Sequence, residues 1–134
     1  MNHFYATPKE LISTTNLNNN ITKKVWGDEN LLEGNEYYTV KIMTVTPGNC
    51  CSFHLHRDKH EAFFLLKGKL IVDLVFASGK KEQVLLENPY DLIVLEPMTT
   101  HSFRCPPGQE EDTIFVECST EDRSEDSYRF TPSK

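Results

Sequence analysis

Short apolar stretches separated by turn-forming residues constrain the fold of this 134-residue chain more than any other feature. The stretches are rich in Val, Ile, Leu, Phe and Tyr, and the seven prolines and six glycines fall mostly between them. Few windows keep an apolar helical period, so the pattern favours strands. We predict strands at residues 37–46, 50–56, 61–66, 69–76, 83–86, 92–95, 101–105 and 113–118. Strands at this spacing predict an all-β sandwich or jelly-roll barrel.

The two ends of the chain differ from this strand-rich centre. Residues 1–24 are polar and rich in Asn, so we expect an N-terminal arm with a minor helix, one turn at residues 8–12. Residues 25–120 are expected to form the barrel domain, and residues 121–134 an acidic tail whose run at 121–127 is a solvated loop. The length fits one core domain.

Composition argues against several classes of function. The chain has 20 acidic and 14 basic residues and a net charge of -6, which argues against nucleic-acid binding. Its longest apolar runs, at 63–66 and 92–95, are far below the roughly 18 residues of a membrane span. We see no basic-then-apolar leader and expect a cytoplasmic protein. The four cysteines show no CxxC spacing, so we interpret them as reduced thiols.

A set of candidate metal ligands lies between residues 48 and 101. His54 and His56 are two apart on a predicted strand, so their imidazoles project from the same face. Glu61 opens the next strand and can add a carboxylate, and His101 is the candidate fourth ligand. A lone histidine on a strand is often structural, but this set suits one divalent transition metal ion (Mn, Fe, Co, Ni or Zn) with open positions for substrate.

The spacing of these residues resembles the first signature motif of the cupin superfamily. Residues 48–68 read Gly-x5-His-x-His-x4-Glu-x6-Gly. The aspartate, proline and histidine of the second cupin motif are present at 91, 97 and 101, but Tyr90 and Met98 stand where glycine is usual. The resemblance implies a single cupin jelly-roll β-barrel.

Within that superfamily, the chain resembles type II mannose-6-phosphate isomerases and D-lyxose isomerases. The similar segments are residues 24–27, 38–42, 52–56, 117–120 and 126–129. The resemblance implies a metal-dependent isomerase of a sugar or sugar phosphate, with Lys41 and Glu117 as catalytic residues. The residues themselves leave the orientation of both side chains open, because Lys41 could face solvent and strand parity does not say which face of 113–118 is inside.

Two other functions fit the same ligand set. One is a mononuclear iron or nickel dioxygenase, and the other is a non-catalytic protein that binds a small ligand through the metal. For an anionic ligand, Arg129 is favoured over Arg104, which should point away from the metal if His101 points towards it. Aromatic surface, including Tyr37 and Tyr38, predicts a homodimer.

Overall fold

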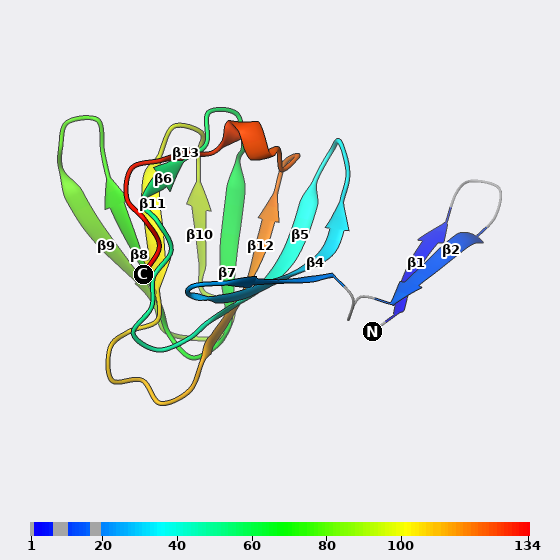
Figure 1. The fold of residues 1–134 in the computed structure, drawn as a ribbon, viewed down its shortest axis with the longest axis horizontal. Helices are drawn as coiled ribbons and strands as arrows, with labels where there is room; N and C mark the ends of the chain where they lie inside the picture. The colour runs from blue at the N-terminus through cyan, green and yellow to red at the C-terminus, as the bar shows by residue number, and fades with distance from the viewer. Residues whose placement is uncertain (1, 7–10, 17–19) are drawn as a thin grey trace.

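Two antiparallel sheets stack face to face in the computed structural model, which describes residues 2–6, 11–16 and 20–134 (Figure 1). The six-stranded sheet has the order β10-β7-β12-β5-β4-β3. Its strands are β3 (Ile21–Lys24), β4 (Gly27–Gly34), β5 (Thr39–Val45), β7 (Glu61–Lys67), β10 (Leu92–Leu95) and β12 (Thr113–Ser119). The five-stranded sheet has the order β13-β6-β11-β8-β9. Its strands are β6 (His54–Leu55), β8 (Leu70–Val75), β9 (Lys81–Leu86), β11 (Thr100–Arg104) and β13 (Tyr128–Arg129).

The all-β prediction is confirmed, and the differences lie mainly at the N-terminus. Every stretch predicted as a strand contains one, although residues 50–56 are reduced to β6 and one isolated bridge at Cys50. Strands β1 (Asn2–Ala6) and β2 (Leu11–Asn16) form a separate hairpin, and β3 pairs with β4 in the larger sheet. All four residues of β3 are exposed, so this edge strand has no apolar alternation to signal it.

The predicted N-terminal helix is wrong where the structure describes it. Residues 8–10 lie outside the described residues, but Leu11 and Ile12 belong to β2. Within the described ranges, the single helical segment is the 3-10 turn η2 (Ser124–Asp126). None of the helical structure there is long and apolar enough to cross a membrane. The predicted domain boundaries at 24 and 120 stay predictions. Strand β3 lies before residue 25 and β13 lies after residue 120, and each pairs into one of the two sheets.

The core fills the space between the sheets because each strand alternates its side chains. In β7, Glu61, Phe63 and Leu65 are buried while their neighbours are only partly so. Phe63, Phe103 and Phe115 pack with ring centroids 5.0 to 5.9 Å apart, in edge-on or tilted contacts. Trp26 packs edge-on against Phe103, with ring centroids 5.0 Å apart. The ring centroid of Phe63 lies 6.1 Å from that of His101, so this aromatic cluster packs against His101.

Turns of the two cupin-like motifs keep the backbone shape that glycine favours. Gly48 and Gly68 have φ values of 82° and 77°. Tyr90 and Met98, which replace the usual glycines of the second motif, adopt φ values of 72° and 69°. Both turns are therefore retained despite the substitutions, and two residues with Cβ atoms are held in a left-handed conformation.

Replacing either residue with glycine should relieve this strain. We expect Tyr90→Gly and Met98→Gly each to raise the free energy of unfolding by about 1 kcal/mol, measured by thermal or urea denaturation. Tyr37→Gly is the matched control, because Tyr37 is as exposed as Tyr90 (74% against 76%) and has no positive φ. Equal effects of Tyr90→Gly and Tyr37→Gly would contradict the interpretation.

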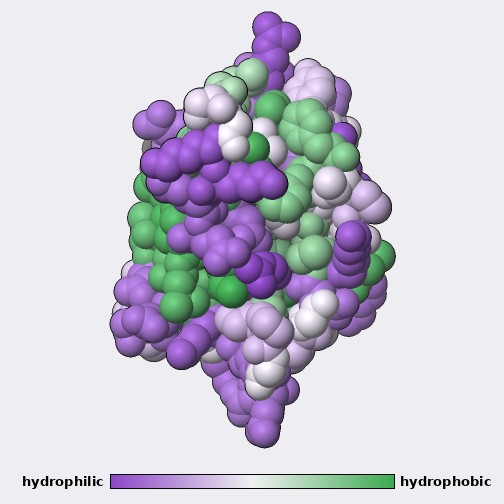
Figure 2. Space-filling view, turned by 90° about the vertical axis from the view of Figure 1, so that its left-hand side faces the viewer, coloured by the Kyte–Doolittle hydropathy of each residue, from purple (hydrophilic) through white to green (hydrophobic). Residues whose placement is uncertain are grey.

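Apolar side chains are exposed on the flank formed by the five-stranded sheet. Figure 2 shows apolar patches interrupted by hydrophilic side chains on this side of the molecule. A shallow cavity of about 610 Å³ there is lined in part by Phe53, Val75 and Phe130, and Leu85 on β9 is half exposed. An exposed apolar surface of this kind is compatible with an interface between subunits.

The homodimer can be tested directly in solution. We expect light scattering or sedimentation at micromolar protein concentration to give the mass of two chains, because association would remove this apolar surface from water. A mass of one chain across the micromolar range would contradict the prediction.

Candidate metal centre

Three histidines converge at one end of the space between the sheets. His54 lies on β6, His56 follows that strand, and His101 lies on β11 directly opposite His54. One ring nitrogen from each lies within 4.8 Å of the others, a separation at which one ion can contact all three. The cluster could hold one metal ion, as the sequence predicted.

Each imidazole is oriented by a backbone carbonyl. The Nδ1 atoms of His54, His56 and His101 lie 2.8, 3.0 and 2.9 Å from the carbonyl oxygens of Ser52, Asp126 and Thr99. A carbonyl only accepts, so each Nδ1 donates and each Nε2 keeps a free lone pair. His101 Nε2 is buried and, within the part of the chain described, has no hydrogen-bond partner. An unsatisfied buried acceptor in this position fits a metal ligand.

The protonation state of the three rings also suits metal binding. Burial lowers the pKa of His54, His56 and His101 from the usual 6.5 to about 4. Neighbouring positive charge lowers these pKa values further: His101 acts on His54, and Lys59 on His56. The rings are therefore neutral at pH 7 and can donate to a cation without first losing a proton.

Glu61 is placed to complete the ligand set. It is buried at the start of β7, and its Oε2 lies 3.3 Å from His56 Nε2 and 3.5 Å from His101 Nε2. Burial and the nearby Glu117 raise the pKa of Glu61 well above its usual value. A divalent cation at this position would offset that cost, so the three imidazoles and the carboxylate fit the predicted ion, and we propose Glu61 as the fourth ligand.

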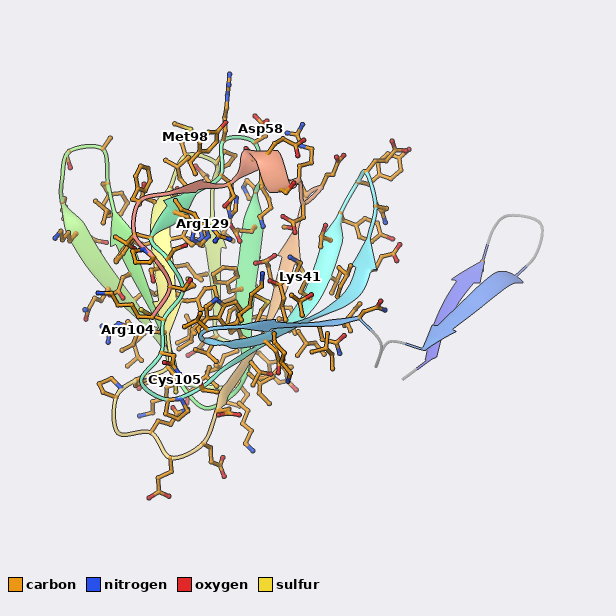
Figure 3. All side chains as sticks on the ribbon, viewed as in Figure 1. Lys41, Asp58, Met98, Arg104, Cys105 and Arg129 are labelled. Atoms are coloured by element: carbon orange, nitrogen blue, oxygen red, sulfur yellow. The ribbon has the colours of Figure 1, made fainter. Side chains whose placement is uncertain are left out.

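A cavity of about 750 Å³ is lined by His54 and His56, and both predicted catalytic side chains, Lys41 and Glu117, line it as well. Lys41 and Glu117 are directly opposite each other on β5 and β12, on the same inward faces as Met43 and Phe115. Glu117 is only 4% exposed, and Figure 3 shows Lys41 beside β12 and β5. The tertiary structure thus resolves the orientation that parity left open.

Lys59 is a buried member of the site that the sequence analysis missed. Its side chain is 5% exposed, and its Nζ lies 3.5 Å from Glu117, 3.3 Å from Asp122 and 3.9 Å from Glu61. Burial alone would lower the pKa of Lys59, but these three carboxylates raise it above its usual value. Its position two residues before Glu61, in phase with the buried face of β7, was the available signal.

Lys41 joins the same network from the other side of the cavity. Its Nζ lies 2.7 Å from both Glu29 and Asp122. Burial opposes the charge of Lys41, but Glu117, Asp122 and Glu29 raise its pKa above the usual value. Four carboxylates therefore surround two ammonium groups, and this excess of negative charge is what a bound divalent cation would neutralise.

We predicted a solvated loop for the acidic run at 121–127, and this prediction is wrong for Asp126. Asp126 is buried, and its carboxylate accepts hydrogen bonds from the backbone N–H groups of Arg57, Asp58 and Lys59. Its carbonyl oxygen holds His56. The tail therefore holds the turn that carries His56, a candidate metal ligand, through contacts across about 70 residues that no local pattern encodes.

Comparison with known proteins identifies the fold. The sequence matches no protein-family profile and no curated protein. The structure resembles the capsular polysaccharide assembling protein CapF from Staphylococcus aureus, with a TM-score of 0.70 at 15% identity over 82% of this chain and 31% of CapF. It also resembles the oxalate decarboxylase of Lactobacillus farciminis, with a TM-score of 0.68 at 17% identity over 82% of this chain and 33% of that protein. For the oxalate decarboxylase of Bacillus subtilis the TM-score is 0.70 at 16% identity, over 82% of this chain and 29% of that protein.

These similarities show the fold and no more, because the identities are so low. The chain spans about a third of each of these proteins. The two packed antiparallel sheets are those of a cupin jelly roll, as the motif spacing predicted.

Metal binding can be tested with matched histidine variants. We expect calorimetry with Mn²⁺ or Co²⁺ to show one ion per chain, and His101→Ala to weaken binding more than about 100-fold because a buried ligand is lost. His60→Ala is the control, since His60 is exposed and lies outside the cluster. No heat of binding to the wild-type protein, or equal losses in the two variants, would contradict the assignment.

The pH behaviour of the metal-free protein gives a second test. Nitrogen NMR should show His54, His56 and His101 as neutral Nδ1–H tautomers at pH 6, with protonation only towards pH 4. The unfolded chain takes up these protons near pH 6.5, so the three rings reduce stability as pH falls from about 6.5 to about 4. The raised pKa of Glu61 has the opposite effect, because the folded protein binds that proton more tightly than the unfolded chain and gains stability as the pH falls. Charged imidazoles at pH 6 would refute the prediction.

Proposed function

We propose that this protein is a metal-dependent isomerase that interconverts the aldose and ketose forms of a sugar or sugar phosphate. The observation that carries the proposal is the cavity itself, in which Glu117 and two lysines lie beside the three-histidine cluster. A protein that only binds a ligand through its metal has no need of buried acid and base groups there.

The reaction moves a proton between C1 and C2 of the sugar through an enediol. An ion held by the three histidines and Glu61 would act as a Lewis acid on the two adjacent oxygens of the substrate. Glu117 would remove the proton from one carbon and return it to the other, because it is a buried carboxylate lining the same cavity.

Lys41 and Lys59 have a different role in this proposal. The raised pKa of each means that the ammonium form persists at neutral pH, so neither is a proton acceptor. Lys59 would hold Glu117 in place through its 3.5 Å contact. Lys41 would donate a hydrogen bond to a substrate oxygen as negative charge develops on it.

A mononuclear iron or nickel dioxygenase is the second candidate. The same three histidines and one glutamate support it, and the cavity is large enough for a small chelating substrate. The buried acid–base network favours the isomerase, because proton transfer between two carbons requires a base. Oxygen consumption by the iron-loaded protein with a small diol or diketone would favour the dioxygenase.

The acid–base role of Glu117 predicts a specific loss of turnover. In the Mn-loaded protein, Glu117→Gln should lower kcat for sugar isomerisation by at least about 100-fold, with one metal ion still bound. The assay follows ketose formation, and deuterium uptake at C2 from D2O, for lyxose, mannose and their phosphates. Lys23→Met is the control, since Lys23 also lines the cavity but forms its ion pair with Asp28, at 3.3 Å. Unchanged deuterium uptake in Glu117→Gln would exclude Glu117 as the base.

A further inference from the structure

We propose that Arg129 forms an anion-binding subsite beside the metal centre, which receives a phosphate or carboxylate group of the substrate. The proposal rests on the proposed function in taking the ligand to be the substrate, and it narrows the substrate class to anionic sugars. It makes no use of the acid–base network.

Strand pairing puts Arg129 next to a metal ligand. β13 pairs with β6 so that Arg129 is directly opposite His54. Side chains of directly opposed residues project from the same face of a sheet, with Cβ atoms about 5 Å apart. Both residues line the 750 Å³ cavity, and Figure 3 shows Arg129 over the space between the sheets. One small molecule can therefore reach the histidine cluster and the guanidinium together.

Among the described residues, Arg129 is the one cavity-lining cation whose side chain has no hydrogen bond or ion pair. The others are each committed to a carboxylate within 4 Å, namely Lys23 to Asp28, Lys24 and Lys41 to Glu29, Lys59 to Asp122 and Arg123 to Asp58. Arg129 is exposed on β13, so its unpaired guanidinium is open to a ligand that enters the cavity. Its planar fork matches a phosphate or carboxylate bidentately, which the paired lysines cannot do.

The backbone around Arg129 is held firmly in place. Phe130 N–H donates to the Phe53 carbonyl at 2.8 Å, and Cys50 and Lys134 exchange two backbone hydrogen bonds of 2.8 and 3.0 Å. The hydroxyl of Thr131 accepts a hydrogen bond from Phe53 N–H at 2.9 Å. The tail thus forms a strand-like wall of the cavity, and a preorganised wall lowers the entropic cost of binding.

Arg104, in contrast, is paired with a carboxylate outside the cavity. Its Nε bonds to Asp73 at 2.8 Å, and it is absent from the cavity lining. This agrees with the expectation that Arg104 points away from the metal when His101 points towards it. Of the two arginines considered from the sequence, only Arg129 is free to bind an anion.

Anion titration of Arg129 variants tests the subsite without any turnover. Inorganic phosphate and acetate are titrated into the full-length protein by calorimetry, with and without bound Mn²⁺. We expect Arg129→Gln to weaken binding of the preferred anion about 30-fold, and Arg129→Lys to recover only part of it, because a bidentate charge-assisted contact is lost. The stronger of the two anions identifies the substrate group as phosphate or carboxylate.

Arg123→Gln is the matched control, because Arg123 lines the same cavity but is already paired with Asp58. It should bind anions like the wild type. Equal losses in both variants, unchanged anion affinity in Arg129→Gln, or no anion binding by the wild type would overturn the subsite. A sugar isomerase assay that fails while the titration succeeds would reject the proposed function and leave the subsite standing.

Discussion

Three hydrogen bonds from imidazole Nδ1 atoms to backbone carbonyls are the constraint on which the site depends. They leave three Nε2 lone pairs directed at one region. The carbonyls belong to Ser52, Thr99 and Asp126, which come from three separate parts of the chain. Ligand geometry is therefore a property of the folded backbone, and the metal centre cannot exist until the tail docks.

Buried charge is the second organising feature. A sandwich of this size would be more stable with apolar groups in place of Lys41, Lys59 and Glu117, because burial of ions costs several kcal/mol each. The chain instead keeps them paired within one cavity beside the histidines. Burial would raise the pKa of Asp122, yet the two lysines lower it to about 2, so the network is held in its charged form. Such an arrangement is expected at a catalytic site rather than in a structural core.

The candidate metal ligands could be named from the sequence because most of the pattern is local. A spacing of two in an extended segment puts His54 and His56 on one face, and Glu61 begins the strand that follows the next turn. His101 could be named only as a candidate from its place at the start of a later predicted strand, since tertiary pairing of β11 with β6 brings it opposite His54. Asp126 was missed because the backbone groups that it binds lie about 70 residues away and leave no periodic signal. Lys59 did have a local signal, its spacing of two from the buried Glu61, but its contacts with Glu117 and Asp122 about 60 residues away are visible only in the fold.

Local patterns in the sequence are enough to predict an all-β chain, turns at Gly48 and Gly68, and a pair of histidines on one face, because strand alternation and turn preference act over a few residues. Only the tertiary structure decided that Lys41 and Glu117 face inward, since "inside" is defined by the opposite sheet. It also decided that Tyr90 takes a conformation suited to glycine, because packing of the surrounding strands outweighs a local cost of about 1 kcal/mol.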